Sequence, residues 1–127
     1  MEKAMYKILV IDDEKDICDI VARSLVRHGY HVQCLTKGDK GLKAARGGDF
    51  DLIIVDWTIP ELSGAGIVKG IRESQDIADR PIIVITGKRD PDFLNQSLDI
   101  GADDFLFKPF SMHLLTRKVD HLLHAHT

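Results

Sequence analysis

Short runs of apolar residues recur along the chain, and each run stops at a polar residue. Four of them read YKILVI, DLIIV, PIIVIT and DFLF. Continuous apolar runs of this length are typical of strands that are buried on both faces of a parallel sheet. The predicted strands are 6–11, 51–55, 82–85 and 104–107, and the most apolar of them, 82–85, is expected to be central.

Between these runs, apolar residues recur every three or four positions, which is the spacing of one face of an α-helix. The first such segment ends at Gly29. Asp90-Pro91 and Ser111 are typical of helix starts, as N-caps and a first-turn proline. We expect helices over 14–28, 39–46, 64–74, from Asp90-Pro91 to about 100, and from Ser111 onward.

The segment 31–35 differs from the other strand candidates because polar and apolar residues alternate in it. Such a strand has one wetter face and is expected near an edge of the sheet. Strand and helix alternate five times along the chain without a linker or an internal repeat. This alternation predicts a parallel sheet with right-handed crossovers and helices on both faces. The length fits a single domain over 1–127.

Composition narrows the class of protein. Apolar residues make up 44% and charged residues 29%, which is ordinary for a globular domain and too apolar for disorder. A net charge of −3 offers no basic surface for direct nucleic-acid binding. The apolar runs are too short to span a membrane, and MEKAMYK lacks the apolar middle of a signal peptide. Cys18 and Cys34 lack CxxC spacing, so we expect reduced thiols in a cytoplasmic protein.

Polar side chains with related chemistry stand where four of the expected strands end. Asp12 and Asp13 follow the first strand, Asp56 ends the next buried run, Thr86 follows 82–85, and Lys108 follows 104–107. Parallel strands end at one sheet edge, where open α/β sheets place their ligands. Three carboxylates favour Mg²⁺ or Mn²⁺, and a hydroxyl with an ammonium can hold an anion beside it. The sequence therefore predicts a phosphoryl-handling site.

These residues also have simpler interpretations. Asp13 can cap the helix that follows it, and Thr86 can be an ordinary β-branched strand residue. Adjacent carboxylates at a strand tip repel each other, however, unless a cation or a proton offsets them. Asp56 at the same sheet edge favours a cation site. Lys108 precedes Pro109, which restricts it to extended backbone, and its ammonium can reach across the edge.

These residues, together with the motif DW-x-x-P-x-x-x-G at Asp56, Trp57, Pro60 and Gly64, resemble a response-regulator receiver domain of the chemotaxis type. The resemblance covers about 6–125, which is nearly the whole chain. It implies a flavodoxin-like, doubly wound (βα)₅ fold with a five-stranded parallel sheet in the order 2-1-3-4-5.

The resemblance also implies a role for each site residue. Asp56 would accept the phosphoryl group, and Mg²⁺ or Mn²⁺ would be held by Asp12, Asp13, Asp56 and the backbone carbonyl of Thr58. Thr86 and Lys108 would contact the phosphoryl oxygens, Phe105 would be the aromatic switch residue, and the bond before Pro109 would be cis. The alternative interpretation of Phe105 is a plain core phenylalanine.

The chain departs from the pattern of winged-helix transcription-factor receivers on its last helix. Those receivers offer a glutamate and an arginine for a paired dimer face, where this chain has Leu114 and Lys118. A weak homodimer is therefore expected at most, and Leu114 is a candidate apolar contact for another partner.

Two residues are expected to flank the path of a water that hydrolyses the aspartyl phosphate. Thr58 stands two positions beyond Asp56, and Lys88 two positions beyond Thr86. We expect Lys88 to lie across the phosphoryl group, so that Lys88→Ala shortens its lifetime several-fold. The alternative is that Lys88 points into solvent and has no effect.

The resemblance implies a phosphorylation switch in two-component signalling rather than a conventional enzyme. A sensor histidine kinase or a phosphotransfer protein would supply the phosphoryl group, and the last two helices and strand would contact an effector. A degenerate receiver that only docks proteins is the main alternative. A metal-dependent aspartyl phosphatase is a third, but it needs a second aspartate where Thr58 stands.

Overall fold

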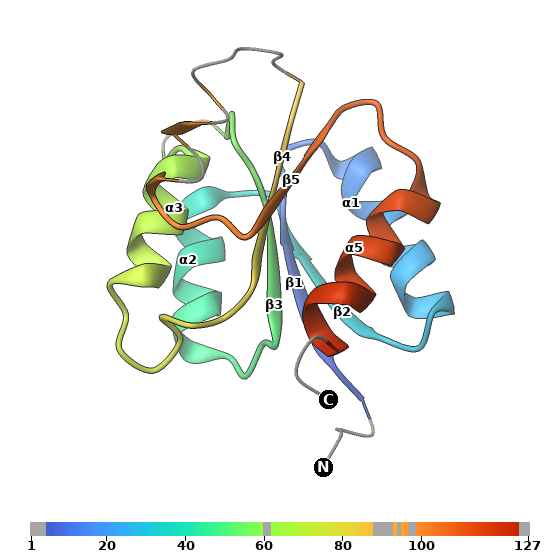
Figure 1. The fold of residues 1–127 in the computed structure, drawn as a ribbon, viewed down its shortest axis with the longest axis horizontal. Helices are drawn as coiled ribbons and strands as arrows, with labels where there is room; N and C mark the ends of the chain where they lie inside the picture. Colours follow the sequence, from blue (N-terminus) through green and yellow to red (C-terminus); the bar gives the residue numbers. More distant parts are fainter. Residues whose placement is uncertain (1–4, 60–61, 88–92, 94, 97–98, 125–127) are drawn as a thin grey trace.

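A computed structural model describes residues 5–59, 62–87, 93, 95–96 and 99–124. Its centre is a five-stranded, wholly parallel sheet in the order β2-β1-β3-β4-β5 (Figure 1). This confirms the predicted fold class and strand order. The strands are β1 Lys7–Ile11, β2 His31–Leu35, β3 Leu52–Asp56, β4 Ile82–Thr86 and β5 Asp104–Phe107.

Helices cover both faces of the sheet. In Figure 1, α2 and α3 lie on one side of the sheet, and α1 and α5 on the other. Their bounds are α1 Lys15–Arg27, α2 Gly38–Gly47, α3 Gly64–Arg72 and α5 Met112–His124. The start of the helix predicted at Asp90-Pro91 lies outside the described residues. No helix in the described part of the chain is both long and apolar enough to cross a membrane.

The strand patterns explain the layering. Every residue of β3 and β4 is buried, as expected for strands packed between two helical layers. β4 lies inside the sheet, beside the middle strand β3, whereas the alternating strand β2 forms one edge. Side chains on the two faces of the sheet form two separate apolar cores, one beneath each pair of helices.

The registers of the strands bring their carboxyl ends together. Ile11 pairs with Val55, and Asp56 pairs with Ile85. Thr86 pairs with Phe107 at the end of β5. The residues that follow or end these four strands therefore share one edge of the sheet.

Candidate functional site

Four polar side chains converge at the carboxyl edge of the sheet. Asp12 follows β1, Asp56 ends β3, Thr86 ends β4, and Lys108 follows β5. Asp12 and Thr86 are fully buried, and Asp56 is 2% exposed. Buried carboxylates are rare unless they are paired or bind a metal, so this burial sets the two aspartates apart from surface acids.

A third carboxylate completes an acidic cluster. Asp12, Asp13 and Asp56 each offer an oxygen within 4.8 Å of the others, and Asp13 is the solvent-exposed member. The N-cap of α1 is Glu14, and no side-chain hydrogen bond caps that helix start. The alternative interpretation of Asp13 as a helix cap therefore has no support in the structure.

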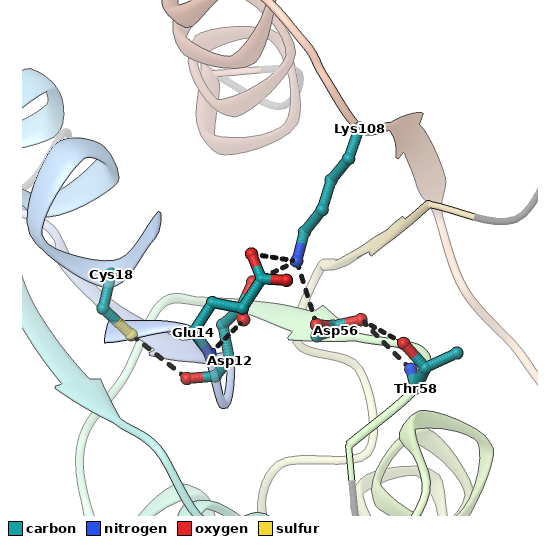
Figure 2. Close-up of polar contacts among 6 residues, drawn as sticks. All are labelled: Asp12, Glu14, Cys18, Asp56, Thr58 and Lys108. Atoms are coloured by element: carbon teal, nitrogen blue, oxygen red, sulfur yellow. Dashed lines mark hydrogen bonds and ion pairs between the residues drawn. The ribbon is translucent and has the colours of Figure 1, made fainter. Parts of the chain in front are cut away.

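Lys108 spans this cluster, with its ammonium between the strand ends (Figure 2). Its Nζ lies 3.1 Å from Asp12 Oδ2 and 3.1 Å from Asp56 Oδ2, and Glu14 Oε2 lies 3.4 Å away. Burial lowers the pKa of the Lys108 ammonium, but its interactions with the carboxylates of Asp12 and Asp56 outweigh burial and raise the pKa above its usual value. The ammonium is therefore charged across the physiological range.

The surroundings of Asp12 disfavour its charged form. Burial raises its pKa from 3.8 to about 6, aided by the charge of Asp56 and opposed by the backbone N–H of Glu14 and by Lys108. The Glu14 N–H donates to Asp12 Oδ1 at 2.8 Å. The other oxygen, Oδ2, is buried and accepts no hydrogen bond from any described residue, although it pairs with Lys108. An under-satisfied carboxylate oxygen beside two further carboxylates fits a hard cation such as Mg²⁺.

The segment after β3 holds the Asp56 carboxylate in position. The Thr58 N–H and hydroxyl both donate to Asp56 Oδ1, at 3.0 and 3.3 Å (Figure 2). Asp56 Oδ2 is left facing Lys108. The start of α3 packs closely against the end of β3, since a Cβ on Gly64 would lie 2.5 Å from the carbonyl oxygen of Asp56. Gly64 therefore permits the close approach of α3 to the β3 end.

Aromatic rings form a group beside the acidic cluster. Phe105 contacts Phe107 and Phe93 edge-on, with ring centroids 5.6 and 6.4 Å apart. Trp57, next to Asp56, contacts the same Phe93 at 5.0 Å. Phe105 is half-buried rather than part of the closed core, so its ring has both packing partners and access to the surface.

Thr86 and Lys108 are also linked through the backbone, because the Lys108 N–H donates to the Thr86 carbonyl at 2.7 Å. The Lys108-Pro109 peptide bond is cis. Lys88 and Pro60 lie outside the described residues. Sequence reasoning missed Glu14 as a third partner of Lys108, although its place in the run IDDE is a usable signal.

On the last helix, Leu114 and Lys118 have different environments. Leu114 is 43% exposed, whereas Lys118 pairs with Asp104 of β5 at 2.9 Å. Because this pair lies within one chain, Lys118 already has a carboxylate partner without a dimer.

Fold and site together define a class: a doubly wound α/β domain with an acidic, lysine-bridged site at the carboxyl edge of its sheet. The sequence model of the response regulator receiver domain matches residues 8–120, and the chain belongs to that family.

Curated relatives agree with this assignment. The chain is 36% identical over 119 residues to the transcriptional regulatory protein PcoR of Escherichia coli, covering 94% of this chain and 52% of that protein. It is 39% identical over 119 residues to the response regulator SaeR of Staphylococcus epidermidis, covering 94% of this chain and 51% of that one. The chain thus spans about half the length of these relatives.

Solved structures with the same fold include the chemotaxis protein CheY4 of Vibrio cholerae, with a TM-score of 0.88 and 30% identity over 94% of this chain and 99% of that one. The receiver domain of sensor histidine kinase PA1611 from Pseudomonas aeruginosa has a TM-score of 0.86 at 26% identity, covering 94% of this chain and 98% of that one. That structure has a magnesium ion coordinated in its active site cleft.

Proposed function

We propose that this receiver domain accepts a phosphoryl group on Asp56 in an Mg²⁺-dependent reaction. One observation carries the proposal: the ammonium of the partly buried Lys108 lies 3.1 Å from one oxygen each of Asp12 and Asp56. A carboxylate is a weak nucleophile, and its attack on phosphorus needs positive charge close to the transferred oxygens. Lys108 supplies such a charge beside the oxygen of Asp56 that Thr58 leaves unbonded.

The divalent cation would be held by Asp12, Asp13, Asp56 and the Thr58 carbonyl. When bound, Mg²⁺ supplies charge neutralisation for the oxygens of the transferred group. The protein contributes a set of hard oxygen donors whose most buried member, Asp12 Oδ2, lacks a hydrogen bond from the described residues. The magnesium-bound receiver of PA1611 supports the same assignment by likeness.

Thr86 and Phe105 would turn phosphorylation into a surface change. An aspartyl phosphate adds charge and acceptor oxygens at the Asp56 end of β3. The Thr86 hydroxyl, at the end of the adjacent strand β4, would follow those oxygens. The half-buried Phe105 ring would fill the vacated space, and β5 and the last helix would present the change to an effector.

A sensor histidine kinase or a phosphotransfer protein would donate the phosphoryl group. The relatives PcoR and SaeR are regulators about twice as long as this chain. By likeness to them, the surface change would act on an effector region joined to the receiver domain. The last helix offers the exposed Leu114, and its pairing of Lys118 with Asp104 supports a weak homodimer at most. Thr58 and Lys88 remain the proposed determinants of phosphate lifetime.

Incubation with acetyl phosphate and Mg²⁺, read by intact mass, tests the proposal. The wild type should gain one phosphoryl group, and Asp56→Asn should gain none. Asp51→Asn is the matched control, because Asp51 lies at the opposite end of β3, where it accepts the Lys7 N–H. A docking-only receiver would leave the wild type unmodified. Stoichiometric labelling of Asp56→Asn would contradict the acceptor assignment.

A further inference from the structure

Two cysteines that are sixteen positions apart meet behind the acidic cluster. Cys18 lies on α1 and Cys34 on the edge strand β2, and both are free thiols. The Cys34 Sγ donates to the Cys18 carbonyl oxygen at 3.3 Å. The Cys34 sulfur thus lies directly against the backbone of Cys18, and the two side chains are neighbours. Neither residue has a part in the phosphoryl chemistry proposed above.

This thiol pair is connected to the backbone of Asp12 at two points. The Cys18 Sγ donates to the Asp12 carbonyl oxygen at 3.4 Å (Figure 2). The Asp12 N–H donates to the carbonyl of Leu35, the residue after Cys34, at 3.1 Å. Both peptide groups of Asp12 are thus held by the segments that carry the thiols, so a change at the sulfurs acts directly on a proposed metal ligand.

The two thiols differ in accessibility. Cys18 is 1% exposed, whereas Cys34 is half-buried on an edge strand and can be reached from solvent. A partly exposed thiol with a second thiol beside it is the arrangement in which oxidation continues to a disulfide.

We propose that Cys18 and Cys34 form a modification site, at which a hydroperoxide oxidises them to an intramolecular disulfide. The Cys34 sulfur attacks the peroxide, the O–O bond breaks, and Cys34 sulfenic acid and one molecule of water (or an alcohol) result. The Cys18 sulfur then attacks the sulfenic sulfur, forming the S–S bond as the S–O bond breaks and a second oxygen leaves as water. The two thiols lose two electrons and two protons, which the peroxide takes up.

Disulfide formation removes the S–H that donates to the Asp12 carbonyl. It also holds the two sulfurs about 2 Å apart, which fixes α1 against β2. The Asp12-Asp13-Glu14 segment lies between β1 and α1 and must adjust. The expected result is a several-fold loss of Mg²⁺ affinity that is restored by reduction. This consequence rests on the proposed metal site, whereas the disulfide itself does not.

The test treats the full chain with hydrogen peroxide and maps disulfides on unreduced peptides by mass. Cys34→Ser is the main variant, since its side chain is only half-buried, and Cys18→Ala is the second. Mg²⁺ affinity, read from the emission of Trp57, is measured before oxidation, after it, and after dithiothreitol. The expected result is a link between the Cys18 and Cys34 peptides, with a reversible affinity loss that Cys34→Ser does not show.

Three results would overturn the inference. A disulfide found only between two chains, or Cys34 oxidised beyond sulfenic acid while Cys18 stays a free thiol, excludes the intramolecular pair. A mapped Cys18–Cys34 bond with unchanged Mg²⁺ affinity excludes the coupling to Asp12. If the reduced protein gives no Mg²⁺ response at all, the proposed metal site is wrong. The peptide map then still shows whether the disulfide between Cys18 and Cys34 forms.

Discussion

Replacing Asp12 with asparagine should stabilise the protein in the absence of divalent cations. The carboxylate is fully buried, close to the charged Asp56, and carries one oxygen without a hydrogen bond from the described residues. Asparagine has nearly the same shape and can still accept the Glu14 N–H at its side-chain oxygen. The substitution therefore removes a buried charge and keeps the Glu14 hydrogen bond, while the Lys108 ammonium turns away from the new NH₂ group to its other partners, Asp56 and Glu14.

The size of the gain follows from the pKa of Asp12. In the folded protein this pKa is raised from 3.8 to about 6, so the native state binds the proton more tightly than the unfolded chain. The ionised form is thereby disfavoured on folding, by at most about 3 kcal/mol. This destabilisation is fully present above pH 6, and it disappears as the pH falls from about 6 towards 3.8.

Urea unfolding in EDTA, followed by circular dichroism, checks this prediction. At pH 7.5, the free energy of unfolding of Asp12→Asn should exceed that of the wild type by about 2–3 kcal/mol. This difference raises the urea midpoint by roughly one molar. The difference should shrink as the pH falls to 5 and the wild-type carboxyl takes up its proton. Asp13→Asn is the matched control, because Asp13 is exposed, and it should shift the midpoint far less.

Two outcomes would refute the reasoning. In the first, Asp12→Asn is less stable than the wild type at pH 7.5, which would mean that the Lys108 ion pair outweighs the cost of burial. In the second, the gain in the free energy of unfolding is the same at pH 5 and pH 7.5. The gain would then not come from removing the Asp12 charge.

Three further predictions concern the site and its support. Mg²⁺ should change the emission of Trp57, which adjoins Asp56, and a fluorescence titration of Asp13→Asn should give a much smaller response; equal responses would contradict the metal site. Gly64→Ala should lower the free energy of unfolding by about 1–3 kcal/mol, because its Cβ would meet backbone atoms at 2.5 Å. Gly47→Ala, whose Cβ would meet nothing within 4 Å, is the urea-unfolding control and should lose no stability. Lys108→Met should slow labelling by acetyl phosphate roughly a hundredfold, and an unchanged rate, followed by mass, would remove Lys108 from the chemistry.

Much of the fold was predictable because its signals are local. Apolar runs with no alternation identified β1, β3, β4 and β5, and alternation in 31–35 identified the edge strand β2. The alternation of strands and helices predicted the parallel, doubly wound class. It did not predict the strand order, which came from the likeness of the Asp56 motif and its partners to receiver domains.

The carboxyl-edge cluster was predictable for a related reason. In a parallel sheet every strand ends at the same edge, so residues at strand ends are neighbours whatever separates them in sequence. Asp12, Asp56, Thr86 and Lys108 were placed together in this way, and the structure brings them to one edge.

The sequence by itself thus determined which segments form strands and helices, and which residues stand at the strand ends. Only the tertiary structure decided how the side chains contact one another. It placed Lys108 beside Glu14, left Asp12 Oδ2 without a hydrogen bond from the described residues, and put Cys34 against Cys18. The spacing of apolar residues follows the backbone repeat of a helix or a strand, so it can be recognised from residues that are close in sequence. Pairing depends on helix-to-sheet distances and side-chain rotamers, which are set by the packing of the whole core.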